Sequence, residues 1–345
     1  MKLLIVTQKV DTNDQLLGFF VAWIKRFSAK FDSVLVVCLQ KGTYDLPANV
    51  RVVDLGKDRG LSKVVWVWNF YRTIIGMSDQ YDTVLVHMNP IWMVLGGLIW
   101  ILMGKFRGLW YTHKTVTFKL KLAEKFSQKI FTASKESFRL PSKKVIVTGH
   151  GIDTELFKPN LLSTNHYPLT TILSVGRIAP VKNYGVLIEA ANILKEQGLS
   201  FHISMVGEPA LPSDQEYMQK LKAQIHVLGL DQTFTFTGKV GIHQLSSIYQ
   251  SHQLFVHLSR TGSVDKVLLE AMASGMQVVS CNDSARSFLP SILLFGDNDP
   301  AQLANKIKSL VNQPVDPALR QYVVEHHNLD RLIERLFREL AYPLV

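Results

Sequence analysis

The sequence predicts an α/β protein made of two doubly wound domains of similar size. The chain has 345 residues, 47% of them hydrophobic and 19% charged, which fits about two globular domains. Short, continuous apolar runs alternate with helical stretches, the pattern of parallel sheets whose strands are joined by crossover helices. This alternation is interrupted once, at residues 158–170, where two prolines and several polar residues indicate a linker.

The first half contains apolar runs typical of strands that are buried on both faces. These runs are LLIVT (3–7), VLVVCL (34–39), VRVVDL (50–55), TVLVHM (83–88), GLWYTH (108–113), KIFTAS (129–134) and KVIVTG (143–148). Helical stretches such as LLGFFVAWIKRFSAKF (16–31) separate many of them. We therefore expect a parallel sheet with crossover helices in this half.

The same pattern returns after the linker. The expected strands are TTILSVG (170–176), FHISMVG (201–207), TFTFTG (233–238), LFVHLS (254–259), QVVSC (277–281) and SILLFG (291–296). Helices are expected over 183–198, near 214–228, near 243–250, and within RTGSVDKVLLEAMASG (260–275). Near the C-terminus, LDRLIERLFREL (329–340) has apolar residues at helical spacing.

These patterns divide the chain into three parts. We expect a first domain over 1–160, a second over 161–325, and a C-terminal helix over 326–345 that packs back toward the first domain. Two sheets of this type are expected to face each other across a cleft. Because ligands of such sheets bind beyond the carboxyl ends of the strands, functional residues are expected there.

Cysteine content and apolar runs favour a cytoplasmic protein. The only cysteines, Cys38 and Cys281, lie far apart within apolar runs, which excludes a disulfide framework and predicts buried thiols. The N-terminal MKLLIVTQ is interpreted as a first strand rather than a signal peptide. The longest apolar run, residues 91–103, is shorter than the roughly 20 residues that cross a bilayer. It is interpreted as a buried helix or as a helix that enters a membrane surface.

The net charge of +10 is concentrated in the first half of the chain. Residues 1–165 hold 23 Lys and Arg against 12 Asp and Glu, whereas residues 166–345 hold 15 against 16. The excess is largest in residues 105–144, with 11 basic and 2 acidic side chains. Such a patch attracts nucleic acid, anionic lipid head groups or phosphorylated substrates, or it is a solvated face that aids solubility.

Several common enzyme classes lack their motifs in this chain. No G-x-G-x-x-G turn follows the opening strand of either half, as a nicotinamide-binding domain would require. The sequence also has no P-loop, no H-E-x-x-H, no G-x-S-x-G and no spaced Cys/His set for zinc.

The segment GRIAPVKN (176–183) places two cations at the end of an expected strand. The strand ends at Gly176, and Arg177 and Lys182 follow within one short loop before a helix. Two such cations at a ligand-binding edge suit a diphosphate, since Arg binds bidentately and Lys acts as a point charge. The alternative is a pair of exposed basic residues in a loop.

The segment RTGSVDKVLLEAMASG (260–275) places an acid inside an apolar helix. Gly262 and Ser263 permit tight backbone geometry, and the helix is expected to begin near Asp265, where free N–H groups favour a phosphate. Glu270 then lies in the second turn, where a carboxylate can accept from two adjacent ribose hydroxyls. The alternative for Glu270 is an i,i+4 ion pair with Lys266.

Together these segments resemble the retaining glycosyltransferases of family 4, which have the GT-B fold of two Rossmann-like domains. GRIAPVKN, followed about 80 residues later by LLEAMASG, resembles the donor half of that family. Further similarity lies in VTGHGIDTELFKP (147–159), TFTFTGKV (233–240), TASKES (132–137) and YTHK (111–114). The resemblance extends over nearly the whole chain, and it is closest over 143–280.

The resemblance implies roles for individual residues. Arg177 and Lys182 match the pair that holds the donor diphosphate and stabilises the leaving group. Glu270 matches the acid that binds the donor ribose, and His113 matches the histidine near the reacting centre. The other residues implied at the donor site are Gly176, Val240, Gly262, Ser263, Val264 and Lys266.

One departure from the family pattern concerns a second acid. The family has two glutamates spaced as E-x7-E, and the first of them corresponds to Gly262, since EGFG is replaced by GSVD. Asp265 is the nearby carboxylate that either takes over the role of the missing acid or caps the following helix.

The activity that the resemblance implies is transfer of a hexosyl unit from a nucleoside diphosphate sugar, of UDP or GDP, to a hydroxyl acceptor with retention of configuration. No cofactor or metal ion is expected, because the two cations stabilise the departing diphosphate, which itself takes the acceptor proton. The expected acceptor is a glycan or lipid-linked glycan of the cell envelope, bound by the basic N-terminal domain at an anionic membrane surface.

Three other functions remain open on the sequence. A nucleotide-sugar 2-epimerase shares the architecture, and it would release free nucleoside diphosphate without an acceptor product. A non-catalytic nucleotide-sugar-binding protein would explain Gly262. A nucleic-acid-binding protein would explain the basic patch, although no base-stacking or groove-reading motif supports it.

Overall fold

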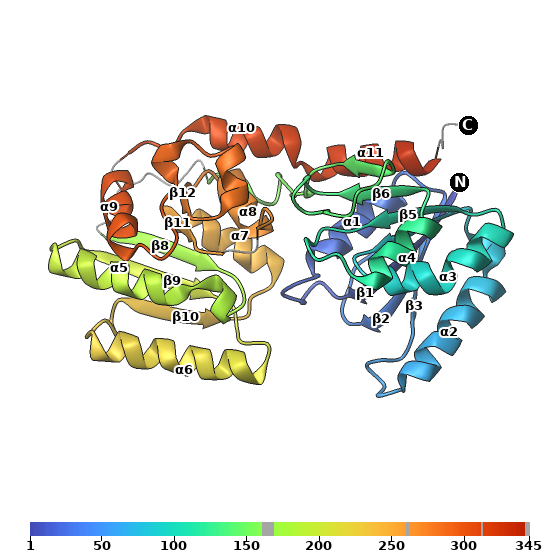
Figure 1. Cartoon of the computed structure of the whole chain (residues 1–345), viewed down its shortest axis with the longest axis horizontal. Helices are drawn as coiled ribbons and strands as arrows, with labels where there is room; N and C mark the ends of the chain where they lie inside the picture. The colour runs from blue at the N-terminus through green and yellow to red at the C-terminus, as the bar shows by residue number, and fades with distance from the viewer. Residues whose placement is uncertain (161–168, 260–261, 312, 342–345) are drawn as a thin grey trace. The chain divides into compact units, whose positions relative to one another are not determined.

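The computed structural model describes residues 1–160, 169–259, 262–311 and 313–341 of the chain (Figure 1). It divides into two compact units, Met1–Gly151 with His327–Val345 and Ile152–His326. The predicted boundary after residue 160 is therefore too late, because Ile152 and Phe157 are buried in the core of the second unit. Most of the predicted linker, residues 161–168, lies outside the described residues.

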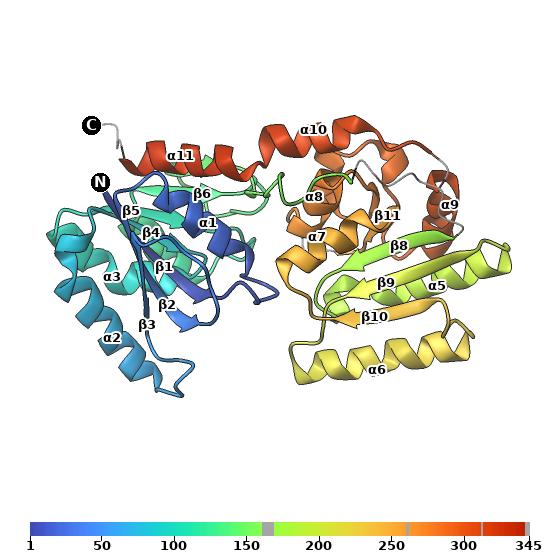
Figure 2. The ribbon, with the colours of Figure 1, turned by 180° about the vertical axis from the view of Figure 1, so that it is seen from behind.

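Unit 1 is a seven-stranded parallel sheet with helices on both faces (Figures 1 and 2). Its strands follow the order β3-β2-β1-β4-β5-β6-β7. The strands are β1 (Lys2–Val10), β2 (Ser33–Lys41), β3 (Val50–Asp54), β4 (Thr83–His87), β5 (Phe106–Trp110), β6 (Lys129–Thr132) and β7 (Val145–Val147). The helices are α1 (Phe19–Ser28), α2 (Lys63–Gly76), α3 (Pro90–Leu102), α4 (Phe118–Phe126) and α11 (Leu329–Ala341).

The two faces of this sheet carry separate apolar cores. Alternate β1 residues point to opposite faces, so Leu3 and Ile5 join one core and Leu4 and Val6 the other. The first core contains residues of α1 and of α11, including Leu332. The second core contains residues of α2, α3 and α4. Figure 1 shows the layer of α2, α3 and α4, and Figure 2 shows α1 with α11 on the other face.

Unit 2 contains a five-stranded parallel sheet in the order β10-β9-β8-β11-β12. The strands are β8 (Thr170–Val175), β9 (Phe201–Val206), β10 (Phe234–Gly238), β11 (Leu254–His257) and β12 (Gln277–Ser280). The helices are α5 (Tyr184–Glu196), α6 (Pro212–Val227), α7 (Ile242–Gln250), α8 (Lys266–Ala273), α9 (Pro300–Leu310) and α10 (Pro317–His326).

The strand order of unit 2 reverses between β8 and β11. From β8 the chain continues outward to β9 and β10, and it then returns to β11 on the other side of β8. Loops that leave these two neighbouring strands diverge to opposite faces of the sheet. Their divergence opens the crevice where doubly wound sheets bind ligands.

One predicted strand is wrong. Residues 291–296 form a short 3-10 turn over Ser291–Leu293, and only Leu294 makes an isolated bridge to Ser280 of β12. The apolar pattern has another cause there, because Leu293 and Phe295 are buried in the core of unit 2. Pro290, just before the turn, also lacks the N–H that a continuous strand needs.

Two further observations concern cysteines and apolar helices. Cys38 and Cys281 are both buried, as the sequence predicts. Across the described parts of the chain, no helix combines the length and the apolar character needed to cross a bilayer.

Candidate functional site

The residues of GRIAPVKN lie directly after β8, at the carboxyl edge of the unit 2 sheet. Gly176 has φ +151°, and a Cβ built on it would lie 3.1 Å from Cε of Lys182. The Tyr184 hydroxyl donates to the Gly176 carbonyl at 3.4 Å. Glycine therefore allows Lys182 to fold back against the strand end, and the Lys182 side chain is only 16% exposed.

Arg177 is oriented by an acid at the start of α6, the helix that follows β9. Its Nε lies 3.6 Å from Oδ2 of Asp214, a buried carboxylate in the first turn of α6. Asp214 also accepts from the backbone N–H of Leu211 at 3.2 Å. This contact holds Arg177 near the carboxyl ends of β8 and β9. The Arg177 side chain remains 38% exposed.

Asp265 connects the loop after β11 to the loop after β8. Its Oδ2 lies 2.7 Å from Nζ of Lys182 and 3.1 Å from Nε2 of His257. Burial alone would raise the pKa of this carboxyl, but Lys182 and His257 outweigh burial and hold the pKa well below its usual range. Asp265 is therefore ionised at neutral pH.

The helix-cap interpretation of Asp265 is wrong. Asp265 occupies the N-cap position of α8, but its side chain accepts no hydrogen bond from the N–H groups of the first turn. The side chain is directed instead to Lys182 and His257, and the charged ammonium of Lys182 is a stronger partner for a carboxylate than a backbone amide.

A buried polar network lies behind Asp265, and the sequence analysis missed it. His257, the last residue of β11, contacts Ser280 of β12 through Nδ1 at 2.9 Å. The Ser280 hydroxyl also accepts from the N–H of Asn282 at 3.1 Å. The Asn282 side chain donates to the carbonyl of Ser263 at 3.2 Å, which holds the loop before α8. Polar residues at the ends of two adjacent apolar strands were the available signal.

The loop before α8 requires glycine at one position. Gly262 has φ +67°, a left-handed conformation that a residue with a side chain adopts only at a cost. A glutamate at this position, as in the family pattern, would be strained. Ser263 is partly exposed, whereas Val264 is buried and packs into the unit 2 core.

Glu270 and Lys266 lie one turn apart on α8 and interact electrostatically. Glu270 is 7% exposed and accepts from the Tyr249 hydroxyl of α7 at 3.2 Å. Burial raises the pKa of Glu270, and the neighbouring Lys266 opposes this rise. Burial lowers the pKa of Lys266 to about 7, and Glu270 opposes this change. The ion-pair interpretation of Glu270 is thus compatible with the geometry, and a role in ribose binding stays a prediction.

Two further predicted residues lie apart from this cluster. Val240 follows β10 and its side chain is buried in the unit 2 core. His113 belongs to unit 1, three residues after β5, where it is exposed and its Nδ1 accepts from the N–H of Thr115 at 3.1 Å. A role for His113 beside the donor stays a prediction.

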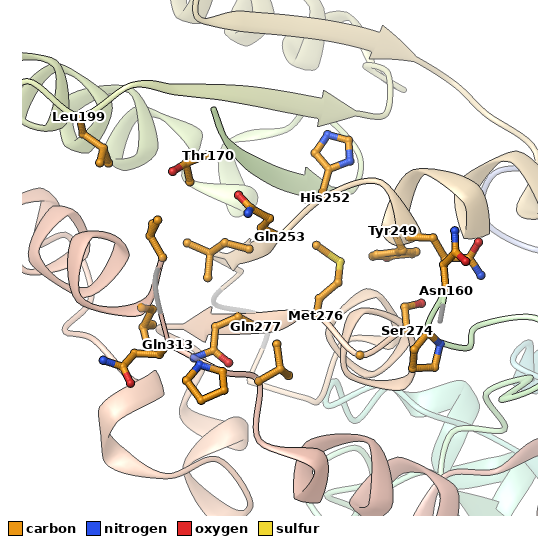
Figure 3. Close-up of a pocket in the computed structure, with 18 of the residues that line it drawn as sticks. Asn160, Thr170, Leu199, Tyr249, His252, Gln253, Ser274, Met276, Gln277 and Gln313 are labelled. Carbon is orange, nitrogen blue, oxygen red and sulfur yellow. The ribbon is translucent and has the colours of Figure 1, made fainter. Parts of the chain in front are cut away.

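A cavity of unit 2 lies at the amino edge of its sheet, opposite the Arg177, Lys182 and Asp265 cluster (Figure 3). It has a volume of about 730 Å³, and its lining includes Thr170, Leu254 and Gln277, where β8, β11 and β12 begin. No Lys, Arg, Asp or Glu occurs among the described residues that line it. It therefore offers no charge to neutralise a diphosphate, and we place the candidate site at the carboxyl edge.

In the parts of the chain that the structure describes, no group of three or more His, Cys, Asp and Glu side chains is arranged to hold a metal ion.

The arrangement of two doubly wound α/β units is the GT-B fold, which solved glycosyltransferase structures share. The sequence model described as "Glycosyl transferases group 1" matches residues 164–327, which is most of unit 2. Unit 2 of the chain therefore matches this family.

Curated relatives carry names of the same family. The chain is 32% identical over 159 residues to the amylovoran biosynthesis glycosyltransferase AmsK of Erwinia amylovora, which covers 44% of this chain and 37% of the relative. It is 27% identical over 222 residues to the putative colanic acid biosynthesis glycosyltransferase WcaL of Escherichia coli K12, covering 59% of this chain and 52% of the relative. The chain thus spans between a third and about half of these relatives' length.

Solved structures share the fold over the whole chain. HepE from Anabaena, crystallised in complex with UDP, has a TM-score of 0.77 and 17% identity, with 99% of this chain and 100% of that chain covered. WaaG, a glycosyltransferase involved in lipopolysaccharide biosynthesis, has a TM-score of 0.69 and 13% identity, with 98% and 99% covered. At these identities the similarity establishes the fold.

Proposed function

We propose that this protein is a retaining glycosyltransferase that moves a hexosyl unit from a nucleoside diphosphate sugar to a hydroxyl acceptor. The observation that carries the proposal is the cluster of Arg177, Lys182 and Asp265 at the carboxyl edge of unit 2. It lies in the unit that matches the family, at the switch point where doubly wound sheets bind ligands.

The chemical demand of this reaction is the departure of a diphosphate from the anomeric carbon. Arg177 and Lys182 supply two positive charges in the loop after β8, and the first turn of α8 adds backbone N–H groups. Charge-assisted hydrogen bonds contribute about 1.5–3 kcal/mol each, so each cation has a large share in stabilising the leaving group. These protein charges are proposed to make a metal ion unnecessary.

Retention is proposed to follow from transfer on one face of the sugar. The bond between the anomeric carbon and the β-phosphate oxygen breaks, and the acceptor oxygen forms its bond to the same face. The departing phosphate oxygen takes the acceptor proton. The proposal therefore needs no protein general base, and His113 is assigned only to binding near the sugar.

Asp265 is proposed to replace the acid that is absent at Gly262. Its carboxylate is ionised and lies beside the cation that would hold the donor phosphate. His257 and Ser280 fix its orientation from behind, so it is held rigidly enough to accept a sugar hydroxyl.

The acceptor class is proposed from the relatives. AmsK and WcaL are named for amylovoran and colanic acid biosynthesis, and WaaG for lipopolysaccharide biosynthesis. HepE was crystallised with UDP and with UDP-glucose. A UDP or GDP sugar as donor and a cell-envelope glycan as acceptor are consistent with these names.

The test is a thermal-shift screen of UDP, GDP and ADP sugars, followed by product analysis with the best donor. Nuclear magnetic resonance of the product gives the anomeric configuration, which we expect to match that of the donor. Arg177→Ala and Lys182→Ala are expected to abolish transfer with unchanged circular dichroism. Lys308→Ala, an exposed change on α9, is the control. An inverted product, or full transfer by both variants, contradicts the proposal.

A second candidate function is donor binding without transfer. The observation that favours it is the left-handed backbone conformation of Gly262. A glutamate at this position would be strained in that conformation. Tight binding of a nucleotide sugar without product, over a panel of saccharide and lipid-linked acceptors, would support this alternative.

A further inference from the structure

The outer face of the α2–α4 layer of unit 1 exposes large apolar side chains. On α2, Val64 and Trp68 are 78% and 69% exposed, and on α3, Leu98 and Leu102 are 58% and 79% exposed. Phe118, at the start of α4, is 73% exposed. Single exposed apolar residues are normal, but monomeric proteins seldom expose several on neighbouring elements without a binding role.

The exposed residues of each helix lie on one side of it. On α2, Val64, Trp68 and Ile75 are spaced by whole turns, and on α3, Leu98, Ile101 and Leu102 have the i, i+3, i+4 spacing. Packing against the sheet does not explain them, because other residues do this, including Phe70, Ile74, Met93 and Trp100 in the core. Both helices are therefore apolar on two sides, and only one side is covered within the unit.

The three helices lie side by side, so their outer faces form one surface (Figure 1). The rings of Phe70 and Trp92 join α2 to α3 with centroids 4.7 Å apart, and the Tyr71 hydroxyl donates to the carbonyl of Leu95 at 3.2 Å. Glycine at position 97 allows α3 to approach α4, since a Cβ there would lie 2.5 Å from the Phe126 ring.

The same surface is positively charged. Residues 63–125 contain eight Lys and Arg against three Asp and Glu. Lys121 and Lys125 stand on the exposed side of α4, one turn apart and one turn after Phe118. Arg72 is exposed one turn after Trp68 on α2. Apolar side chains surrounded by exposed cations are the combination that binds the interface of an anionic membrane.

We propose that this surface, composed of the outer faces of α2, α3 and α4, docks the protein on an anionic lipid bilayer. The apolar residues enter the boundary between head groups and acyl chains, and the lysines and Arg72 contact the lipid phosphates. The inference does not rest on the proposed function, because it concerns helices of unit 1 and no residue assigned to the donor site.

The test is flotation of the full chain with vesicles of phosphatidylcholine, alone or mixed with phosphatidylglycerol. We expect binding to the mixed vesicles at low salt, at least tenfold weaker binding to pure phosphatidylcholine, and partial loss in high salt. A chain that stays at the bottom of the gradient with anionic vesicles at low salt overturns the proposal.

Matched variants separate the two parts of the surface. Trp68→Ser with Leu102→Ser is expected to reduce binding at least tenfold, and Lys121→Gln with Lys125→Gln is expected to reduce the preference for anionic vesicles. The controls are Val227→Ser, an apolar residue of α6 that is 83% exposed, and Lys220→Gln on the same helix, both expected to bind like the unchanged chain.

Two outcomes with these variants overturn the proposal. Binding of the Trp68→Ser, Leu102→Ser variant at the unchanged level would show that the apolar face is not used. Concentration-dependent self-association in sedimentation velocity, abolished by the same substitutions, would show that a second copy of the chain covers the surface. Circular dichroism of each variant confirms that unit 1 is still folded.

Discussion

Nζ of Lys182 lies 2.7 Å from Oδ2 of Asp265, although the two residues are 83 positions apart in the chain. The contact joins the loop after β8 to the loop after β11, across the switch point of the unit 2 sheet. The cation expected to hold a donor phosphate therefore already faces a fixed carboxylate. A donor phosphate that binds Lys182 would therefore share the ammonium group with the Asp265 carboxylate.

Asp265→Asn is expected to separate donor binding from transfer. The amide removes a negative charge beside Lys182, so we expect the nucleoside diphosphate to bind about fivefold more tightly. Transfer should fall by about 10²-fold if the carboxylate holds the sugar in the transition state. Isothermal titration and initial rates measure the two effects. The control is Glu216→Gln, which changes an exposed acid on α6. If both variants had the same donor affinity and the same transfer rate, Asp265 would have no role in the donor site.

Glu270→Gln tests the predicted contact with the ribose. A carboxylate that accepts from two hydroxyls contributes about 1.5–3 kcal/mol, so nucleoside diphosphate affinity should fall about 10-fold to 100-fold. Inorganic pyrophosphate, which has no ribose, should bind as before. Tyr249→Phe keeps the acid and removes only its hydroxyl partner, so a smaller loss is expected. A similar loss of affinity for the nucleoside diphosphate and for pyrophosphate would mean that Glu270 stabilises the structure of α8 and does not contact the ribose.

Donor affinity is expected to fall as the pH rises from 6 to 8. The pKa of Lys266 is lowered by burial to about 7, so the amine is charged below this pH and neutral above it. The diphosphate diester of a sugar nucleotide keeps its charge over this range, and it prefers the charged amine. We expect an affinity loss of about threefold to tenfold over this range. Lys266→Gln should remove the pH dependence, and an unchanged slope in that variant would assign it to another group.

Arg320→Met is expected to destabilise unit 2. Arg320 of α10 donates from Nη1 to the carbonyls of Phe157, at 3.0 Å, and of Ala273, and from Nη2 to that of Thr154 at 3.1 Å. Loss of these bonds leaves the carbonyls unsatisfied, so the free energy of unfolding should fall by about 2–3 kcal/mol. Urea denaturation measures it.

The matched change for this comparison is Arg286→Met. Arg286 is an exposed residue whose Nε contacts Asp283 at 3.1 Å, and such surface pairs contribute about 0–1 kcal/mol. Equal destabilisation by the two substitutions would contradict the role assigned to Arg320.

The central strands of both units, such as β1 and β4 or β8 and β11, could be predicted because they are buried on both faces and form continuous apolar runs. This rule fails where a loop is also buried, as at Leu293 and Phe295, which cover the core without joining the sheet. It also misplaces the domain boundary, because Ile152 and Phe157 follow the last strand of unit 1 and yet pack into unit 2.

The individual motifs of the site could be predicted from the sequence, but the contacts between their side chains could not. Chain order shows that cations follow β8 and that acids follow β11, since each motif is local. The sequence does not show that Lys182 is paired with Asp265, because that depends on which strands are neighbours. His257 was missed because one histidine at the end of an apolar strand is more often a core residue than part of a site.

The central claim is that the carboxyl edge of unit 2 binds the donor diphosphate through Arg177 and Lys182. Isothermal titration of UDP, GDP and ADP into the unchanged chain and into the Arg177→Ala, Lys182→Ala double variant tests it most directly. We predict that at least one nucleotide binds the unchanged chain and that the double variant, still folded, binds it at least about 100-fold more weakly. Equal nucleotide affinity in the unchanged chain and the double variant would contradict the claim and would mean that the nucleotide binds elsewhere.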